Sequence, residues 1–275
     1  MKPWRSYIYL LLVLGSSIFV FCLTSKRIKS ESPFRKLLDF SIKGDLMGVI
    51  QIINENPSVD INMDLHEVTP LLAATSENHY PVVLVLLAKG ADPNKGTKSN
   101  FTPLMASSVW GYVAITDLLL QYNASIDARD VDGNTALLFA CRNDNVKIVK
   151  KLLEKNADTN ISNLEGLSPI ILAVLKENVE MVALLLKHGA DPNSKDKYGI
   201  PIIFSPCINN NKAIFKLLMD YGAKIDVQRK GVTLLRIAQK ERYKEIEDLI
   251  INATTKSKPR REEDRAGASV EKVDH

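Results

Sequence analysis

Short apolar runs recur along this chain at a constant interval, and a polar tripeptide follows each run. The tripeptides begin at residues 90, 123, 156, 189 and 222, so the interval is 33 residues throughout. They are Gly90-Ala91-Asp92, Asn123-Ala124-Ser125, Asn156-Ala157-Asp158, Gly189-Ala190-Asp191 and Gly222-Ala223-Lys224. A fixed period of this length is typical of stacked repeats, in which each unit packs on its neighbours. The sequence therefore predicts an array of repeats and not one globular core.

Each period also carries the start and stop signals of helices. A Ser or Thr side chain can accept hydrogen bonds from the free N–H groups of a first helical turn, and proline suits the first helical position. Gly or Asn after an apolar run tolerates the left-handed backbone that ends a helix. The start signals are Thr69-Pro70, Thr102-Pro103, Thr135-Ala136 and Ser168-Pro169. Each period is therefore predicted to hold two short helices and a polar loop.

The apolar residues of the second helix recur at helical spacing, as Val146, Val149, Leu152 and Leu153 do. A single helix pair cannot bury such a face, so neighbouring pairs must stack on each other. The predicted fold class is an all-α repeat solenoid, in which helix-turn-helix units are joined by hairpin loops.

Two segments carry a family resemblance. Residues 130–140 read Asp-Val-Asp-Gly-Asn-Thr-Ala-Leu-Leu-Phe-Ala, and residues 189–193 read Gly-Ala-Asp-Pro-Asn. They resemble the ankyrin repeat, whose pattern is Asp-x-x-Gly-x-Thr-Pro-Leu-His-x-Ala, two helices and Gly-Ala-Asp-x-Asn. The resemblance covers residues 34–253 and implies stacked ankyrin repeats that bind proteins. The family's His is replaced in every copy, which favours a more apolar contact between repeats.

The two ends of the array depart from this pattern. We expect residues 31–62 to form an N-terminal capping repeat, and residues 63–253 to hold the ankyrin repeats with a C-terminal cap. In the fifth repeat Pro201 stands at the cap position and Pro206 falls within the first helix. An interior proline costs about 3 kcal/mol and kinks or shortens a helix. Residues 254–275 are charged and poor in apolar residues, so this tail is predicted to be disordered.

The N-terminus carries a different signal. Residues 7–23 form a near-continuous apolar run with basic residues on both sides. The run is slightly shorter than the roughly 20 residues that usually span a bilayer. We expect residues 1–30 to act as a signal or transmembrane anchor that begins with an apolar helix. An uncleaved anchor is the preferred interpretation, and a cleaved secretory signal or a buried helix is the alternative.

The sequence gives weaker evidence for the side of the membrane on which the repeats lie. The basic residues before and after the run nearly balance, so the positive-inside rule does not decide the topology. Because a lone apolar segment at the N-terminus is most often an export signal, we expect a membrane-anchored domain on the periplasmic side of a bacterial inner membrane. A periplasmic domain after signal cleavage is the alternative, and a domain that faces the cytoplasm is another.

Composition agrees with a folded array. The 275 residues are 45% hydrophobic and 25% charged, with a formal net charge of +4. These fractions are ordinary for globular proteins. The excess of positive charge is too small and too dispersed to indicate a nucleic-acid partner.

The sequence contains no pattern of catalytic or metal-binding residues. Its four histidines lack the spacing of a ligand set, and no Gly-rich phosphate loop or nucleophile elbow is present. Cys141 and Cys207 occupy the same position of two repeats, where a small core residue is usual, so buried thiols are predicted. We therefore expect no enzyme, no cofactor, no metal and no small-molecule substrate.

Function should then lie in the surface of the array. The resemblance implies that partners bind the hairpin tips and the exposed side of the first helices. The matching tip positions are Val68, Phe101, Asn134, Leu167 and Ile200, and the matching helix positions are Ser76, Val109, Arg142, Leu175 and Ile208. From these positions and their neighbours, the predicted protein-binding residues are Phe101, Trp110, Asp132, Arg142, Leu167, Lys176 and Tyr198.

The apolar members of this set have two interpretations. An exposed apolar stripe with a polar rim usually marks an interaction site, and aromatic and Arg residues often dominate binding energy. Alternatively, Val68, Leu167 and Ile200 pack between hairpins and Trp110 covers a turn. Polar replacement of Trp110 and Phe101 abolishes binding without unfolding under the first interpretation, and unfolds the array under the second.

The predicted function is a membrane-anchored, non-catalytic module that binds a protein partner and neutralises or positions it. By analogy with exported bacterial ankyrin proteins, it is a candidate immunity protein against a secreted lipase-type toxin. The candidate partner is thus a toxin or a membrane-associated hydrolase. The alternatives are a structural scaffold or adaptor for membrane or envelope proteins, and a secreted effector that binds host proteins.

Overall fold

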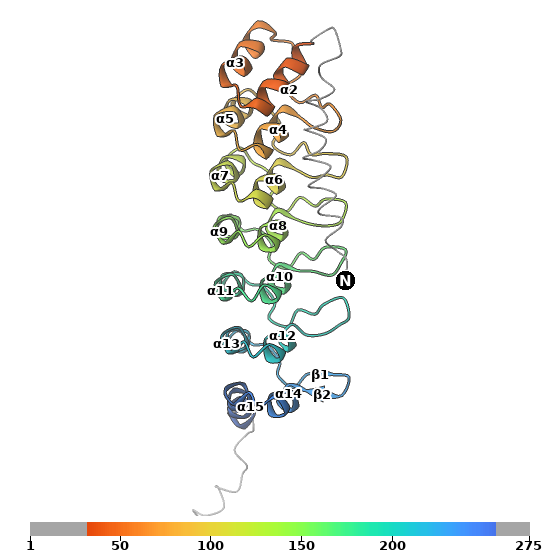
Figure 1. The fold of residues 1–275 in the computed structure, drawn as a ribbon, viewed down its shortest axis with the longest axis vertical. Helices are drawn as coiled ribbons and strands as arrows, with labels where there is room; N and C mark the ends of the chain where they lie inside the picture. Colours follow the sequence, from red (N-terminus) through yellow and green to blue (C-terminus); the bar gives the residue numbers. More distant parts are fainter. Residues whose placement is uncertain (1–31, 257–275) are drawn as a thin grey trace, which may run out of the picture.

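A computed structural model describes residues 32–256 of the chain. Helix pairs stack along one long axis, and the loops between pairs project on one side as hairpins (Figure 1). The first helices are α2 (Pro33–Lys43), α4 (Pro70–Ser76), α6 (Pro103–Trp110), α8 (Ala136–Arg142), α10 (Pro169–Leu175), α12 (Phe204–Ile208) and α14 (Leu234–Glu241). The second helices are α3 (Leu46–Glu55), α5 (Tyr80–Ala88), α7 (Val113–Gln121), α9 (Val146–Glu154), α11 (Val179–Lys187), α13 (Lys212–Asp220) and α15 (Lys244–Lys256). The predicted repeat solenoid is confirmed for this part of the chain.

The helix starts follow the predicted capping chemistry in three of the four copies. The hydroxyl oxygens of Thr69, Thr102 and Thr135 accept hydrogen bonds from the third backbone N–H group that follows each of them. Ser168 is the exception, since its buried hydroxyl has no hydrogen-bond partner. The helix stops also agree, because Gly90 and the other residues at its repeat position have a positive φ, which is +92° for Gly90.

The fifth repeat is irregular, as its prolines predict. First helices begin at residues 103, 136 and 169, so the period places the next start at residue 202. Residues 201–203 instead form a turn, in which the N–H of Ile202 donates to the carbonyl of Ser194 at 3.0 Å. Helix α12 then has five residues, whereas α10 has seven.

The C-terminal end differs from the expectation in two respects. A short antiparallel hairpin, β1 (Gln228–Arg229) and β2 (Val232–Thr233), replaces the loop before α14. Helix α15 ends at Lys256, so residues 254–256 are helical and the predicted disordered tail begins too early. These residues continue a helix whose Ile246 and Ile250 are buried, and helical hydrogen bonding extends past the last buried turn. The remainder of that tail lies outside the described residues.

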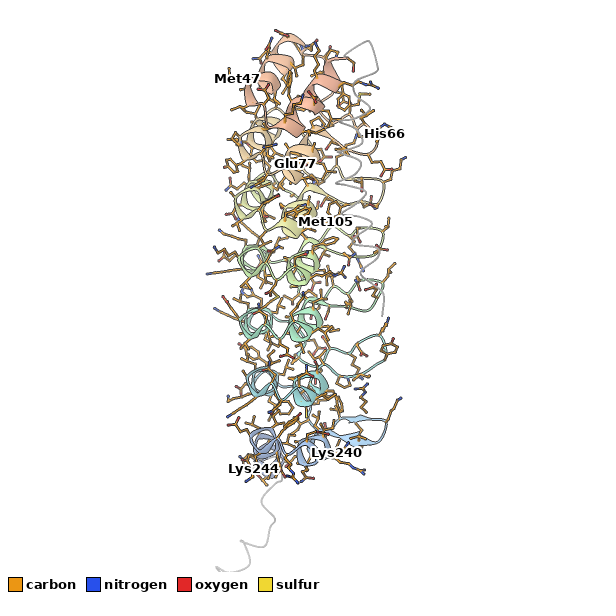
Figure 2. All side chains as sticks on the ribbon, viewed as in Figure 1. Met47, His66, Glu77, Met105, Lys240 and Lys244 are labelled. Carbon is orange, nitrogen blue, oxygen red and sulfur yellow. The ribbon has the colours of Figure 1, made fainter. Side chains whose placement is uncertain are left out.

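One continuous apolar core runs through the stack. Both helices of each pair contribute to it. Val149, Leu152 and Leu153 are almost fully buried, as their spacing predicts, and Val146 is half-buried against the same core. Met105 is buried within the layer of first helices, whereas Met47 on α3 is 73% exposed (Figure 2). Cys141 and Cys207 are buried free thiols, which confirms their prediction. Burial raises the pKa of the Cys207 thiol to about 11.

A ladder of polar side chains ties each loop to the next repeat. In each rung a side-chain oxygen accepts a hydrogen bond from the backbone N–H that begins the next polar turn, at distances of 2.7–3.0 Å. The accepting residues are Asn62, Asn94, Asp127, Asn160 and Asn193. The Asn of the motif Gly-Ala-Asp-x-Asn is therefore a structural residue, because it satisfies a neighbour's backbone.

Within residues 32–256, none of the helices combines the length and the apolar character that crossing a membrane requires. The apolar run at residues 7–23, and with it the proposed anchor of residues 1–30, lies outside the described residues.

Candidate protein-binding surface

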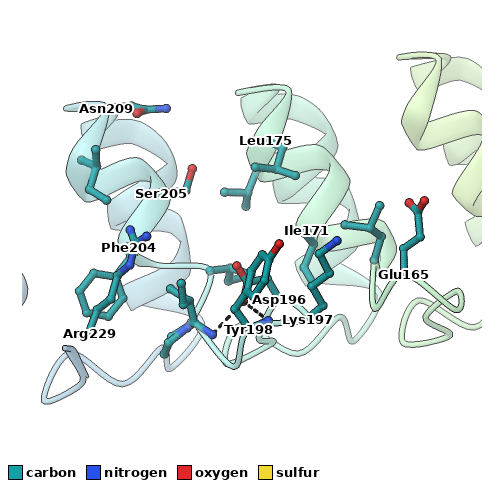
Figure 3. Close-up of a pocket in the computed structure, with 16 residues that line it drawn as sticks. Glu165, Ile171, Leu175, Asp196, Lys197, Tyr198, Phe204, Ser205, Asn209 and Arg229 are labelled. Carbon is teal, nitrogen blue, oxygen red and sulfur yellow. Dashed lines mark hydrogen bonds between the residues drawn. The ribbon is translucent and has the colours of Figure 1, made fainter. Parts of the chain in front are cut away.

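The hairpin tips are held by acceptor side chains at one repeat position, which Asp130, Asn163 and Asp196 occupy. In the fifth hairpin, the Oδ1 atom of Asp196 accepts hydrogen bonds from the N–H groups of Tyr198 and Ile200, both at 2.9 Å (dashed lines in Figure 3). This carboxylate fixes the turn from inside. The side chain of Tyr198 therefore projects outward, and the residue is 76% exposed.

The predicted tip stripe is mostly a packing feature, and the expectation that Phe101 is exposed is wrong. Phe101 and Asn134 are each only 3% exposed, while Leu167 is half-buried. The ring of Phe101 meets that of Phe139 edge to face, with centroids 5.4 Å apart and an interplanar angle of 87°. Adjacent hairpins stack closely, so this position faces the next repeat and not the solvent. Phe101 is thus a core residue of the structure.

The predicted positions on the first helices are more accessible. Trp110 is 47% exposed at the end of α6, and Lys176 is exposed just after α10. Two apolar residues that share one repeat position, Leu175 and Ile208, are 61% and 41% exposed. Arg142 is half-buried, and its Nη2 atom lies 3.4 Å from the Oδ1 atom of Asn134, which it contacts as a hydrogen-bond donor. The side of the first helices that leads to the hairpins therefore presents large apolar groups to solvent.

A groove of about 580 Å³ lies between this helical side and the hairpins of the fourth and fifth repeats. We call it the C-terminal groove. Leu175 on α10 faces it from one side, and Lys197 and Tyr198 face it from the hairpin opposite (Figure 3). Its apolar lining includes Ile171, Leu175, Ile200, Phe204 and Ile208.

The position of the groove follows from the irregular fifth repeat. Pro201 and Ile202 line it from the turn that replaces the start of the helix, and Phe204 and Ser205 line it from the shortened α12. The regular repeats have a first helical turn at the position of Ile202. Loss of that turn coincides with the opening between α10 and α12.

The charges around the groove are not evenly placed. Glu165 lies at the end nearer the N-terminal repeats, and Arg229 extends from β1 at the other end (Figure 3). The Nζ atom of Lys197 lies 5.3 Å from the ring centroid of Tyr198, which is within the range of a cation–π contact. Asp196 already accepts two backbone hydrogen bonds, so its carboxylate is engaged in holding the hairpin.

The structure brings together only some of the predicted protein-binding residues. Leu167 and Tyr198 both line the C-terminal groove, and Lys176 follows its lining residue Leu175. The other four residues belong to earlier repeats: Phe101, Trp110, Asp132 and Arg142.

Sequence reasoning did not select Lys197, Phe204 or Arg229 as site residues. One sequence feature points to this part of the array: residues 201–202 lack the Thr-Pro helix start of the earlier repeats. Pro201 and Ile202, which stand there, line the C-terminal groove. By itself, the loss of this start is typical of a C-terminal cap. Neither the β1–β2 hairpin nor the direction of Arg229 is encoded in the repeat pattern.

Titratable groups give no separate chemical site in the described part of the chain. Residues 32–256 hold no cluster of three or more His, Cys, Asp or Glu side chains suited to a metal ion. Burial, together with the charge of Glu77, raises the pKa of Tyr112. The Tyr112 hydroxyl lies 3.5 Å from the carbonyl oxygen of Ser76, to which it donates across adjacent repeats. This contact is structural.

Comparisons with known proteins agree with the architecture. A family model described as ankyrin repeats (3 copies) matches residues 40–130 and 126–196. No curated protein sequence matches the chain. The ankyrin repeat domain of Bcl-3, a member of the IkappaB protein family, is 26% identical, with a TM-score of 0.70 over 79% of this chain and 97% of that domain. An ankyrin repeat domain from Acinetobacter baumannii AYE is 28% identical, with a TM-score of 0.65 over 68% of this chain and 98% of that domain.

Ankyrin repeats are protein–protein interaction modules and are generally non-enzymatic. The family model spans more than half of the chain, and the stacked helix pairs, capping residues and polar ladder account for its motifs residue by residue. The chain belongs to the ankyrin-repeat family.

Proposed function

We propose that this protein is a non-catalytic binding module whose protein partner docks in the C-terminal groove. The observation that carries the proposal is the exposure of Leu175, Tyr198 and Ile208 around one concavity. An apolar surface of this kind, with a polar rim, is typical of an interaction site. Tyr is also among the residues that most often dominate binding energy.

A capture experiment from the native membrane fraction tests this function. We expect the full chain to retain one stoichiometric partner, and the double variant Leu175→Asp/Ile208→Asp to retain at least about tenfold less of it, a loss of about 1.4 kcal/mol. Two carboxylates in an apolar contact would have to be desolvated on binding, which weakens the complex. Mass spectrometry of both captures measures the change.

The matched control is Leu84→Asp on α5. Leu84 is 38% exposed, close to the 41% of Ile208, but it belongs to the layer of second helices. We expect this variant to capture the partner as the wild type does, and all variants to keep a cooperative thermal transition. Equal capture by the groove variant and the wild type would place the binding surface elsewhere.

We also propose that residues 7–23 anchor the module in a membrane, with the repeats on the periplasmic side of a bacterial inner membrane. The support for the anchor is the apolar run itself, and the support for export is that a lone apolar segment near an N-terminus is most often an export signal. A module held there, without catalytic groups, suits an immunity protein that neutralises a lipase-type toxin as it arrives. Capture of a hydrolase in the experiment above would support that role, and capture of several membrane proteins would favour a scaffold.

Fractionation tests the anchor. We expect the full chain to sediment with membranes and to resist extraction by high salt or alkali, because an apolar segment of this length is held by the hydrocarbon core. A chain that lacks residues 1–30 should move to the soluble fraction. A full chain found in the soluble fraction, or a mature form that begins after residue 23, would contradict an uncleaved anchor.

A further inference from the structure

We infer that the C-terminal groove takes an acidic, amphipathic segment of a partner protein, with its carboxylates toward the fifth and sixth hairpins. This inference rests on the proposed function and specifies the partner of the same site. It follows from an apolar floor, a separation of charge along the groove and the lack of internal partners for the cations at one end.

The floor of the groove accounts for the apolar component. Leu175 and Ile208 come from the same position of successive repeats, and both are more exposed than core residues of that size normally are. Phe204 and Ile171 close the groove behind them. A partner side chain such as Leu or Phe, placed between α10 and α12, would bury these surfaces together.

The rim accounts for the acidic component. The exposed charged residues of the hairpin tips are Asp132 and Glu165 in the third and fourth hairpins, but Lys197, Arg229 and Lys230 in the fifth and sixth. In the fifth hairpin the carboxylate of Asp196 is half-buried and holds the turn. The sign of the rim charge therefore changes along the stack, and the C-terminal groove lies at the change.

The cations at the C-terminal end are not neutralised within the array. Among residues 32–256, no carboxylate oxygen lies within 4.0 Å of the charged groups of Lys197, Arg229 and Lys230. The Nζ atom of Lys197 contacts the ring of Tyr198, and the Cβ atom of Lys197 lies beside Gly166, the residue after Glu165. In the second-helix layer of the described residues, Lys151, Lys212 and Lys216 each pair with a carboxylate, whereas Lys147 and Lys150 do not. Positive charge is thus available to a partner at the groove.

Charge of this kind selects and orients a partner more than it tightens the complex. A segment with carboxylates at one end would align them with Arg229, and would keep them away from Glu165. The reversed orientation would place like charges together. A nucleic acid fits the same cations poorly, because the carboxylate of Glu165 would repel its phosphates, and the exposed floor residues Leu175 and Ile208 are aliphatic.

Two synthetic probe peptides test the inference with the full chain. Both carry the same Leu and Phe residues at helical spacing, and their polar positions are filled with Glu in one and Lys in the other. We expect the Glu peptide to bind at least about tenfold more tightly than the Lys peptide, measured by fluorescence anisotropy. Raising the salt from about 0.1 M to about 1 M, which shortens the Debye length from about 10 Å to about 3 Å, should reduce this ratio.

Charge-reversal variants test whether the residues of the C-terminal groove cause the preference for the Glu peptide. Lys197→Glu/Arg229→Glu should weaken binding of the Glu peptide at least about tenfold and strengthen binding of the Lys peptide. The control Lys147→Glu/Lys150→Glu makes the same change in net charge at two exposed lysines of α9, in the layer of second helices, and should leave both affinities unchanged. Thermal unfolding checks that both variants remain folded.

The outcomes separate this inference from the proposed function. Equal binding of the two peptides, no binding of the Glu peptide, or competition by a single-stranded DNA oligonucleotide would overturn the acidic segment. If the native partner is still lost in Leu175→Asp/Ile208→Asp but retained in Lys197→Glu/Arg229→Glu, the groove binds protein and this inference fails alone. If neither variant loses the native partner, both proposals fail.

Discussion

Phe139→Ala should lower the free energy of unfolding by about 3–5 kcal/mol, the usual cost of removing a buried phenyl ring from a core. Phe139 is 1% exposed on α8, which packs between α6 and α10 near the middle of the stack. The variant also removes the edge-to-face contact with Phe101, and such a pair contributes about 0.5–1.5 kcal/mol beyond its buried area. Urea unfolding followed by circular dichroism measures the change, and with a slope of about 1–3 kcal/mol/M the midpoint should fall by about 1–5 M.

The position of Phe139 near the middle of the array should increase the effect of its removal on unfolding. In a repeat protein, stability is approximately the sum of the stabilities of the repeats and of the interfaces between neighbours. A cavity at Phe139 weakens the interfaces of α8 with α6 and with α10, so we expect the two ends of the stack to unfold less cooperatively.

Trp110→Ala is the matched aromatic control. Trp110 is 47% exposed, so its truncation should cost less than about 1 kcal/mol. Similar losses for Phe139→Ala and Trp110→Ala would contradict the placement of the Phe101–Phe139 pair in the core.

The sequence predicted most of the fold because its signals are local and repeated. Thr102 and Thr135 cap helices in the structure because a hydroxyl beside a free N–H group needs no distant partner. Asn123 occupies the repeat position of Gly90. It ends α7 with a φ of +61°, as that position predicts. The burial of Val149 and Leu152 follows from helical spacing alone.

The binding surface was less predictable because exposure depends on how neighbouring units meet. Phe101 and Trp110 belong to the same repeat, yet one is buried by the next hairpin and the other is not. The C-terminal groove needed an irregular α12, a hairpin that carries Arg229 and a tip that carries Lys197. Each contribution comes from a different loop, and no periodic pattern relates them.

Asn163→Ala should lower the free energy of unfolding by about 2–4 kcal/mol, because it leaves several polar groups without partners at a cost of about 1–3 kcal/mol each. The side chain of Asn163 is 6% exposed. Its Oδ1 atom accepts hydrogen bonds from the N–H groups of Glu165 at 3.0 Å and Leu167 at 2.9 Å. Its Nδ2 atom donates to the Oδ1 atom of Asn134 in the preceding repeat at 2.9 Å. One amide therefore holds a hairpin and links two repeats.

Asn163→Asp separates these two roles. Aspartate occupies the same position as Asp130 and Asp196, where it accepts the equivalent backbone N–H groups, so the hairpin should form normally. It lacks the donor, however, and places a carboxylate oxygen against the Oδ1 atom of Asn134. We expect Asn163→Asp to cost about 1–2 kcal/mol, the value of one buried hydrogen bond replaced by two facing acceptors. Urea unfolding of both variants gives the comparison. An Asp variant as stable as the wild type would show that the link to Asn134 contributes nothing, and an Asp variant as unstable as the Ala variant would show that the hairpin bonds contribute nothing.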